Sequence, residues 1–193
     1  GTTDTSGAVI VKTMNAGVSG VSGMLSFTSG TASSGSSGHF NLFTGSATNG
    51  KGGDMLMSIG SGTTYSGGDM VMSAGLSTAV ASGTGGAVSV STGEGEPTTS
   101  GALIVKTLNA GTLGVSGALR FTSGTASSGG SGYIQIATGS ATNGEGGDIL
   151  VSIGKSKTDP GGDVVVTAGH SGLQSGGAIS IASGEGTTDT SGA

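Results

Sequence analysis

The sequence predicts an all-β protein: one parallel β-solenoid (β-helix) of twelve coils, with about 15 residues in each coil. Glycine recurs along the 193 residues at a spacing of almost always 15, mostly as the second member of a Ser-Gly or Gly-Gly pair. Apolar residues alternate with polar or small ones after each of these glycines, which is the period of a strand. A short fixed period that carries one strand per repeat is typical of a solenoid.

The amino-acid composition alone would favour a disordered protein. Of the 193 residues 44 are glycine, 9% are charged and 3% are aromatic, and Trp and Cys are absent. Chains of this kind are often disordered. The apolar alternation, however, keeps its phase through all twelve units, so we expect a folded chain.

Each unit is expected to be a strand, a corner, a return segment rich in Ser, Thr and Ala, and a second corner. In the unit that begins at Gly147, Ile149 and Val151 would point one way along the strand and Leu150 the other. Glycine suits corners because it tolerates positive φ and close backbone approach. The predicted structural corners are Gly7, Gly23, Gly38, Gly53, Gly68, Gly86, Gly101, Gly117, Gly132, Gly147, Gly162 and Gly177.

The second corner of a unit lies seven residues after the first in ten of the twelve units. In the other two, Met14 and Leu108 replace the glycine, and we expect Asn15 and Asn109 to serve the turn there. Stacking the coils at about 4.8 Å would place the inward side chains in ladders, Met55, Met57, Met70 and Met72 among them. Such an interior is thin and leaves no room for a buried pocket.

A longer period contains the 15-residue one. Residues 7–100 (super-repeat A) match residues 101–191 (super-repeat B) unit by unit, six coils each, so residues 1–193 are expected to form one continuous solenoid. The opening residues 1–8 also reappear as residues 186–193. We therefore expect the chain to be a window of a longer repetitive polypeptide.

The repeat style of Ser-Gly-x-apolar-x-apolar units, such as Gly177-Ala-Ile-Ser-Ile181, resembles known repeat proteins. These are the Gly/Ser/Thr-rich parallel β-solenoids of microbial surfaces and extracellular fibres, particularly those of algae such as diatoms. The resemblance implies a structural role outside the cell or at its surface. It supplies no catalytic residues.

Four aspartates that follow corner glycines are candidate metal ligands: Asp54, Asp69, Asp148 and Asp163. In stacked coils the two members of each pair would lie roughly 4.8 Å apart, where carboxylates repel unless a cation or a hydrogen bond stabilises them. Calcium would suit oxygen ligands. The alternative is that each Asp caps the backbone of a Gly-Gly corner, and it is favoured because two carboxylates are few ligands.

Outward-pointing apolar residues are candidates for lateral contact between molecules, because an apolar stripe on a thin structure is typical of a contact surface. The alternative is that a neighbouring loop covers them. The predicted contact residues are Ile10, Leu56, Val71, Ile104, Leu150 and Val165.

Several functions are disfavoured. Eleven acidic residues against six basic ones give a net charge of −5, which makes nucleic acid an unsuitable partner. No stretch is apolar enough for a membrane span. His39 and His170 occupy different phases of the repeat and have no fixed acidic partner, so we expect no enzyme and, calcium aside, no cofactor.

The predicted function is therefore structural: a component of an extracellular fibre or surface filament, built by stacking coils end to end and by lateral association. The many Ser and Thr residues could carry O-linked glycans. The alternative is an adhesin stalk or a module that binds a surface such as ice or a polysaccharide, which would need one regular outward column. The outward positions include Lys12, Thr28 and Phe43, and such a column is not regular here.

Overall fold

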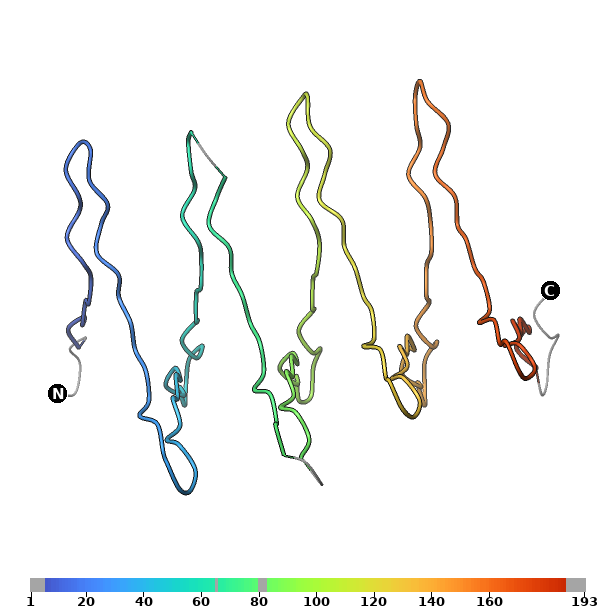
Figure 1. The fold of residues 1–193 in the computed structure, drawn as a ribbon, viewed down its shortest axis with the longest axis horizontal. Coiled ribbons are helices and arrows are strands. Elements are labelled where there is room, and N and C mark those ends of the chain that lie inside the picture. Colours follow the sequence, from blue (N-terminus) through green and yellow to red (C-terminus); the bar gives the residue numbers. More distant parts are fainter. Residues whose placement is uncertain (1–5, 65, 80–82, 187–193) are drawn as a thin grey trace. The chain divides into compact units, whose positions relative to one another are not determined.

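The computed structural model describes residues 6–64, 66–79 and 83–186, and within these ranges it contains no helix and no β-strand. Extended segments are joined by turns and bends, which Figure 1 shows as a ribbon with neither coils nor arrows. The predicted β-solenoid is therefore wrong for these residues. A solenoid needs a ladder of backbone hydrogen bonds between successive coils, and the described residues make five backbone–backbone hydrogen bonds in all.

The described residues also lack the thin apolar interior that the solenoid would have enclosed. Within the described ranges no hydrophobic side chain is buried, and nearly every residue is exposed. The expected ladders of inward side chains are therefore open to solvent.

The period-two alternation is nevertheless visible in the exposure of the side chains. Met55 and Met57, predicted to point inward, are 49% and 63% exposed, whereas Leu56 between them is 88% exposed. The next unit repeats this pattern around Val71. Successive side chains of any extended backbone point to opposite sides, and the lower exposed fractions show that one side of these segments is partly covered.

The chain divides into two units, Gly1–Ser91 and Thr92–Ala193. The division falls nine residues before the predicted start of super-repeat B at Gly101.

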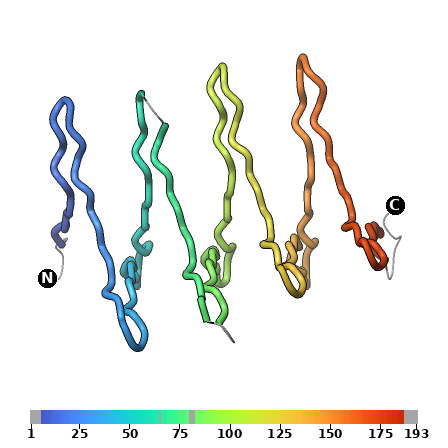
Figure 2. Tube along the Cα trace, in the orientation of Figure 1, coloured from blue at the N-terminus to red at the C-terminus, as the bar shows by residue number. Residues whose placement is uncertain are grey.

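Both units contain the same local geometry 94 residues apart. In the first unit the Gly20 N–H donates to the Gly17 carbonyl at 3.2 Å, and in the second the Gly114 N–H donates to the Gly111 carbonyl at 3.4 Å. Figure 2 shows each turn as a sharp reversal, blue in the first unit and yellow-green in the second. Each turn begins two residues after the asparagine that was expected to form it, Asn15 or Asn109. The predicted position of the chain reversal is therefore corrected.

Bends recur in the return segments of other 15-residue repeats. They lie at residues 33–35, 48–50 and 63–64 in the first unit and at 96–98, 127–129, 142–144, 157–159 and 172–174 in the second. In two of them a serine hydroxyl accepts a backbone N–H: Ser156 from Asp159 at 3.0 Å and Ser171 from Gln174 at 2.9 Å. The 15-residue repeat of the sequence is thus a repeat of local structure.

Three backbone hydrogen bonds each close a loop that runs from the second glycine of one 15-residue repeat to the first glycine of the next repeat. The Gly86 N–H donates to the Gly75 carbonyl at 2.9 Å and the Gly101 N–H to the Gly93 carbonyl at 3.2 Å. The Gly177 N–H likewise donates to the Gly169 carbonyl at 2.9 Å. These loops are closed within the chain and are not shared between stacked coils.

The predicted corner glycines act through close approach. Among the described residues positive φ occurs at Gly35 (105°) and Gly129 (99°), and neither is a predicted corner. A Cβ added at Gly53 would lie 3.3 Å from the Thr44 Cβ, and one added at Gly147 would lie 3.5 Å from the Thr138 Cγ2. A side chain at Gly53 would therefore press on the end of the preceding extended segment, whereas one at Gly147 would make an ordinary van der Waals contact.

Candidate functional site

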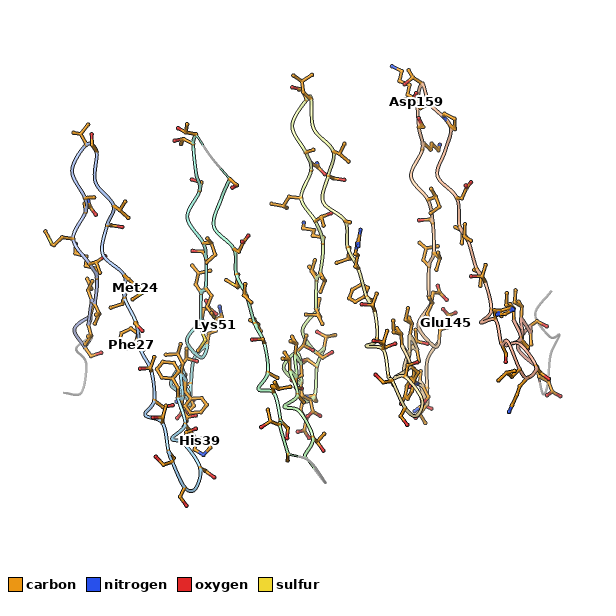
Figure 3. The ribbon with its side chains drawn as sticks, in the orientation of Figure 1. Met24, Phe27, His39, Lys51, Glu145 and Asp159 are labelled. Atoms are coloured by element: carbon orange, nitrogen blue, oxygen red, sulfur yellow. The ribbon has the colours of Figure 1, made fainter. Side chains whose placement is uncertain are left out.

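The described residues form no pocket, and the candidate sites among them lie on the exposed surface. Figure 3 shows side chains projecting into solvent along the extended segments. Within the described ranges no three His, Cys, Asp or Glu residues are grouped so that they could hold a metal ion. The sites to examine are therefore the charged loops and the apolar sides of the segments.

The Lys51 loop is the most defined charged feature. The Nζ of Lys51 lies 2.8 Å from both carboxylate oxygens of Asp54, a predicted metal ligand. Both side chains are nearly four-fifths exposed, so the pair stabilises the loop only weakly. The sequence analysis missed this pair, although the i, i+3 spacing in Lys51-Gly-Gly-Asp54 signals it.

The equivalent loop of super-repeat B has an acidic residue in place of the lysine. Glu145 stands where Lys51 stands, 94 residues later, and Asp148 stands where Asp54 stands. Figure 3 labels Lys51 and Glu145 on their separate loops. The first loop is therefore neutral, while the second carries two carboxylates.

The predicted calcium ligands Asp54, Asp69, Asp148 and Asp163 all have exposed side chains. Asp54 has Lys51 as its partner. Calcium binding by these aspartates stays a prediction.

The predicted lateral-contact residues lie open to solvent. Their exposed fractions run from 75% for Ile104 to 88% for Leu56, and the set is Ile10, Leu56, Val71, Ile104, Leu150 and Val165. The apolar residues on the opposite side of the same segments are exposed as well, which the sequence analysis did not expect. Both sides of these segments are therefore available for contact.

One aromatic contact joins two neighbouring repeats. The rings of Phe27 and Phe40 have centroids 6.5 Å apart at an interplanar angle of 32°. The two residues flank the loop of residues 29–38, whose ends approach each other at Gly38 and Ser29. The sequence signal for this pair is two Phe residues in adjacent repeats, one four residues after Gly23 and the other two residues after Gly38.

Within the part of the chain that the structure describes, no helix has the length and apolar character needed to cross a membrane. No protein-family model, curated protein or solved structure matches the chain.

Proposed function

We propose that this chain is a self-associating structural component of an extracellular fibre or surface filament. The observation that carries the proposal is the exposure of the apolar side chains, which alternate along the extended segments and form no buried core within residues 6–64, 66–79 and 83–186. Apolar surface in water is unfavourable in proportion to its area, at about 25 cal/mol per Å². Association with further copies is the direct way to remove this surface from water.

The backbone supports the same proposal. With five backbone–backbone hydrogen bonds in the described ranges, most N–H and C=O groups of the extended segments have no backbone partner. Extended segments with free backbone groups are templates for pairing with another chain. A second copy offers segments of the same spacing, because the 15-residue repeat fixes the distance between its extended segments and its loops.

The remaining features agree with a structural role. No pocket is formed by the described residues, and eleven acidic residues against six basic ones disfavour nucleic acid as a partner. The proposed extracellular location rests on the repeat style, the Ser-Gly-x-apolar-x-apolar units that resemble those of surface and fibre proteins. Exposed Ser and Thr side chains would be accessible to O-linked glycosylation.

Sedimentation velocity over a range of protein concentrations tests the proposal. We expect the mean mass to rise with concentration, and filaments to be visible by electron microscopy at the highest concentrations. The double variant Leu56→Asn, Val71→Asn should shift assembly to higher concentration, because it removes two highly exposed apolar contacts.

The matched control is Ser58→Asn, Ser73→Asn, which places the same new side chains on the same side of the same segments. It should assemble as the unchanged chain does. A chain that stays monomeric at every concentration would overturn the proposed function, and equal effects of the two double variants would overturn the role of the apolar side chains.

A further inference from the structure

Two Asn-Gly pairs occupy equivalent loops of the two super-repeats. Of the five asparagines in the chain, Asn49 and Asn143 are the two that precede glycine. Asn49-Gly50 lies in the bend at residues 48–50 and Asn143-Gly144 in the bend at residues 142–144, and both asparagines are exposed. We propose that Asn49 and Asn143 are sites of spontaneous deamidation that convert them to aspartate and isoaspartate.

The reaction needs water and no other reactant. The backbone nitrogen of the following glycine, having lost its proton, attacks the side-chain Cγ of the asparagine. The C–N bond to the side-chain amide breaks, and NH₃ leaves with a proton from solvent. Water then opens the resulting cyclic imide at one of its two carbonyl carbons, which gives aspartate or isoaspartate. The net change is one water consumed and one ammonia released.

The structure leaves both backbone nitrogens accessible for this attack. A side chain on the following residue would obstruct ring closure, and glycine has none. A Cβ built at Gly144 would meet no atom within 4 Å, and one built at Gly50 would meet the Ala47 Cβ at 4.0 Å. Within the described residues neither glycine N–H donates a backbone hydrogen bond. The bends can therefore rotate to the geometry that the ring requires.

The neighbouring charges predict different rates at the two sites. Lys51 directly follows Gly50, whereas Glu145 directly follows Gly144. The attacking nitrogen is anionic, so an adjacent positive charge stabilises it and an adjacent negative charge destabilises it. Asp54 neutralises Lys51 in part, but the Asn49 loop is still neutral while the Asn143 loop carries Glu145 and Asp148. Asn49 should therefore react faster than Asn143.

The conversion changes both loops physically. Each event adds one carboxylate, so the neutral Lys51 loop becomes acidic and the Glu145 loop gains a third negative charge. Isoaspartate also brings the former Cβ into the main chain and lengthens the bend by one atom. The chain thus acquires negative charge with age at two fixed positions of its repeat.

Mass spectrometry of the full chain, incubated in mildly alkaline buffer and then digested, tests the proposal. The exchange of NH₂ for OH at Asn49 and Asn143 should proceed several times faster than at Asn15, Asn41 and Asn109, which precede Ala or Leu. Chromatographic separation of the digested peptides should resolve aspartate from isoaspartate at both sites. Conversion at Asn49 and Asn143 no faster than at the other three would overturn the proposal.

Three variants separate the causes. Gly50→Ala should slow Asn49 several-fold and leave Asn143 unchanged, because the added methyl group obstructs ring closure at one site only. Lys51→Glu should bring the rate at Asn49 down toward that at Asn143, whereas Lys12→Glu, a charge change in another unit, should not. If Gly50→Ala leaves the rate at Asn49 unchanged, the cyclic imide route is wrong. If Lys51→Glu leaves the rate at Asn49 unchanged, the proposed effect of the neighbouring charge is wrong.

Discussion

The first glycine of a repeat leaves space for the residue that ends the previous extended segment. A Cβ added at Gly162 would lie 3.1 Å from the Ile153 Cγ2, and one added at Gly68 would lie 2.8 Å from the Ile59 Cγ2. Real Cβ atoms do not approach other atoms as closely as the second distance. Glycine at position 68 is therefore required by sterics and not by its φ angle, which is not positive.

Gly68→Ala should consequently displace the Ile59 side chain from its rotamer, at a cost of about 1 kcal/mol. The methyl resonances of Ile59 in NMR spectra would report the change. Gly67→Ala is the matched control, because its added Cβ meets nothing within 4 Å. Equal shifts of the Ile59 methyl resonances in the two variants would contradict the steric account.

The turn at Gly17–Gly20 is an element whose type follows from its backbone. Turns of types II, I′ and II′ need positive φ at a central residue, and no described non-glycine residue, Val18 and Ser19 included, has positive φ. With a hydrogen bond from Gly20 to Gly17, type I is the turn that fits. Type I turns splay the flanking strands, which explains why no hairpin ladder extends from this turn.

Two proline substitutions within this turn should have opposite effects. Val18→Pro places the fixed φ of proline at the second turn position, where type I accepts it, and should stabilise the turn by about 0.5 kcal/mol. Ser19→Pro, one residue later, forces the preceding residue away from the conformation that the turn requires. The magnitude of the temperature coefficient of the Gly20 amide proton chemical shift should fall in the Val18→Pro variant and rise in the Ser19→Pro variant. The same change in both would contradict a type I turn.

For the whole molecule, the sequence predicts the 15-residue and 94-residue periods of the local structure, but it does not predict whether the extended segments pair with one another. The 15-residue unit and the 94-residue offset both return as repeated turns and bends, and Leu56 is more exposed than Met55 and Met57, as the alternation requires. Alternation is the same in a solenoid coil and in an unpaired extended segment, so it cannot distinguish them. Stacking must also overcome the conformational entropy of 44 glycines with little apolar surface from the Ser- and Thr-rich return segments.

The charged positions differ from the prediction for a related reason. A column of aspartates requires stacked coils, whereas Asp54 pairs with Lys51, three residues away in its own loop. A local ion pair needs no stacking, so sequence spacing was sufficient to predict it. The difference between Lys51 and Glu145 then becomes a property of the two super-repeats that can direct how copies associate.

Under the proposed self-association, super-repeat A of one copy should lie against super-repeat B of the next, since Lys51 then faces Glu145 and like charges are separated. Lys51→Glu and Glu145→Lys should each weaken assembly by about two- to threefold per exposed contact, and the double variant should restore it at low salt. Lys51→Gln controls for loss of the Asp54 pair. If A lies against A, like charges face each other in every variant, so unchanged assembly in all three charge variants would contradict this register. Because exposed charges are screened by salt, the differences should disappear in a concentrated salt solution.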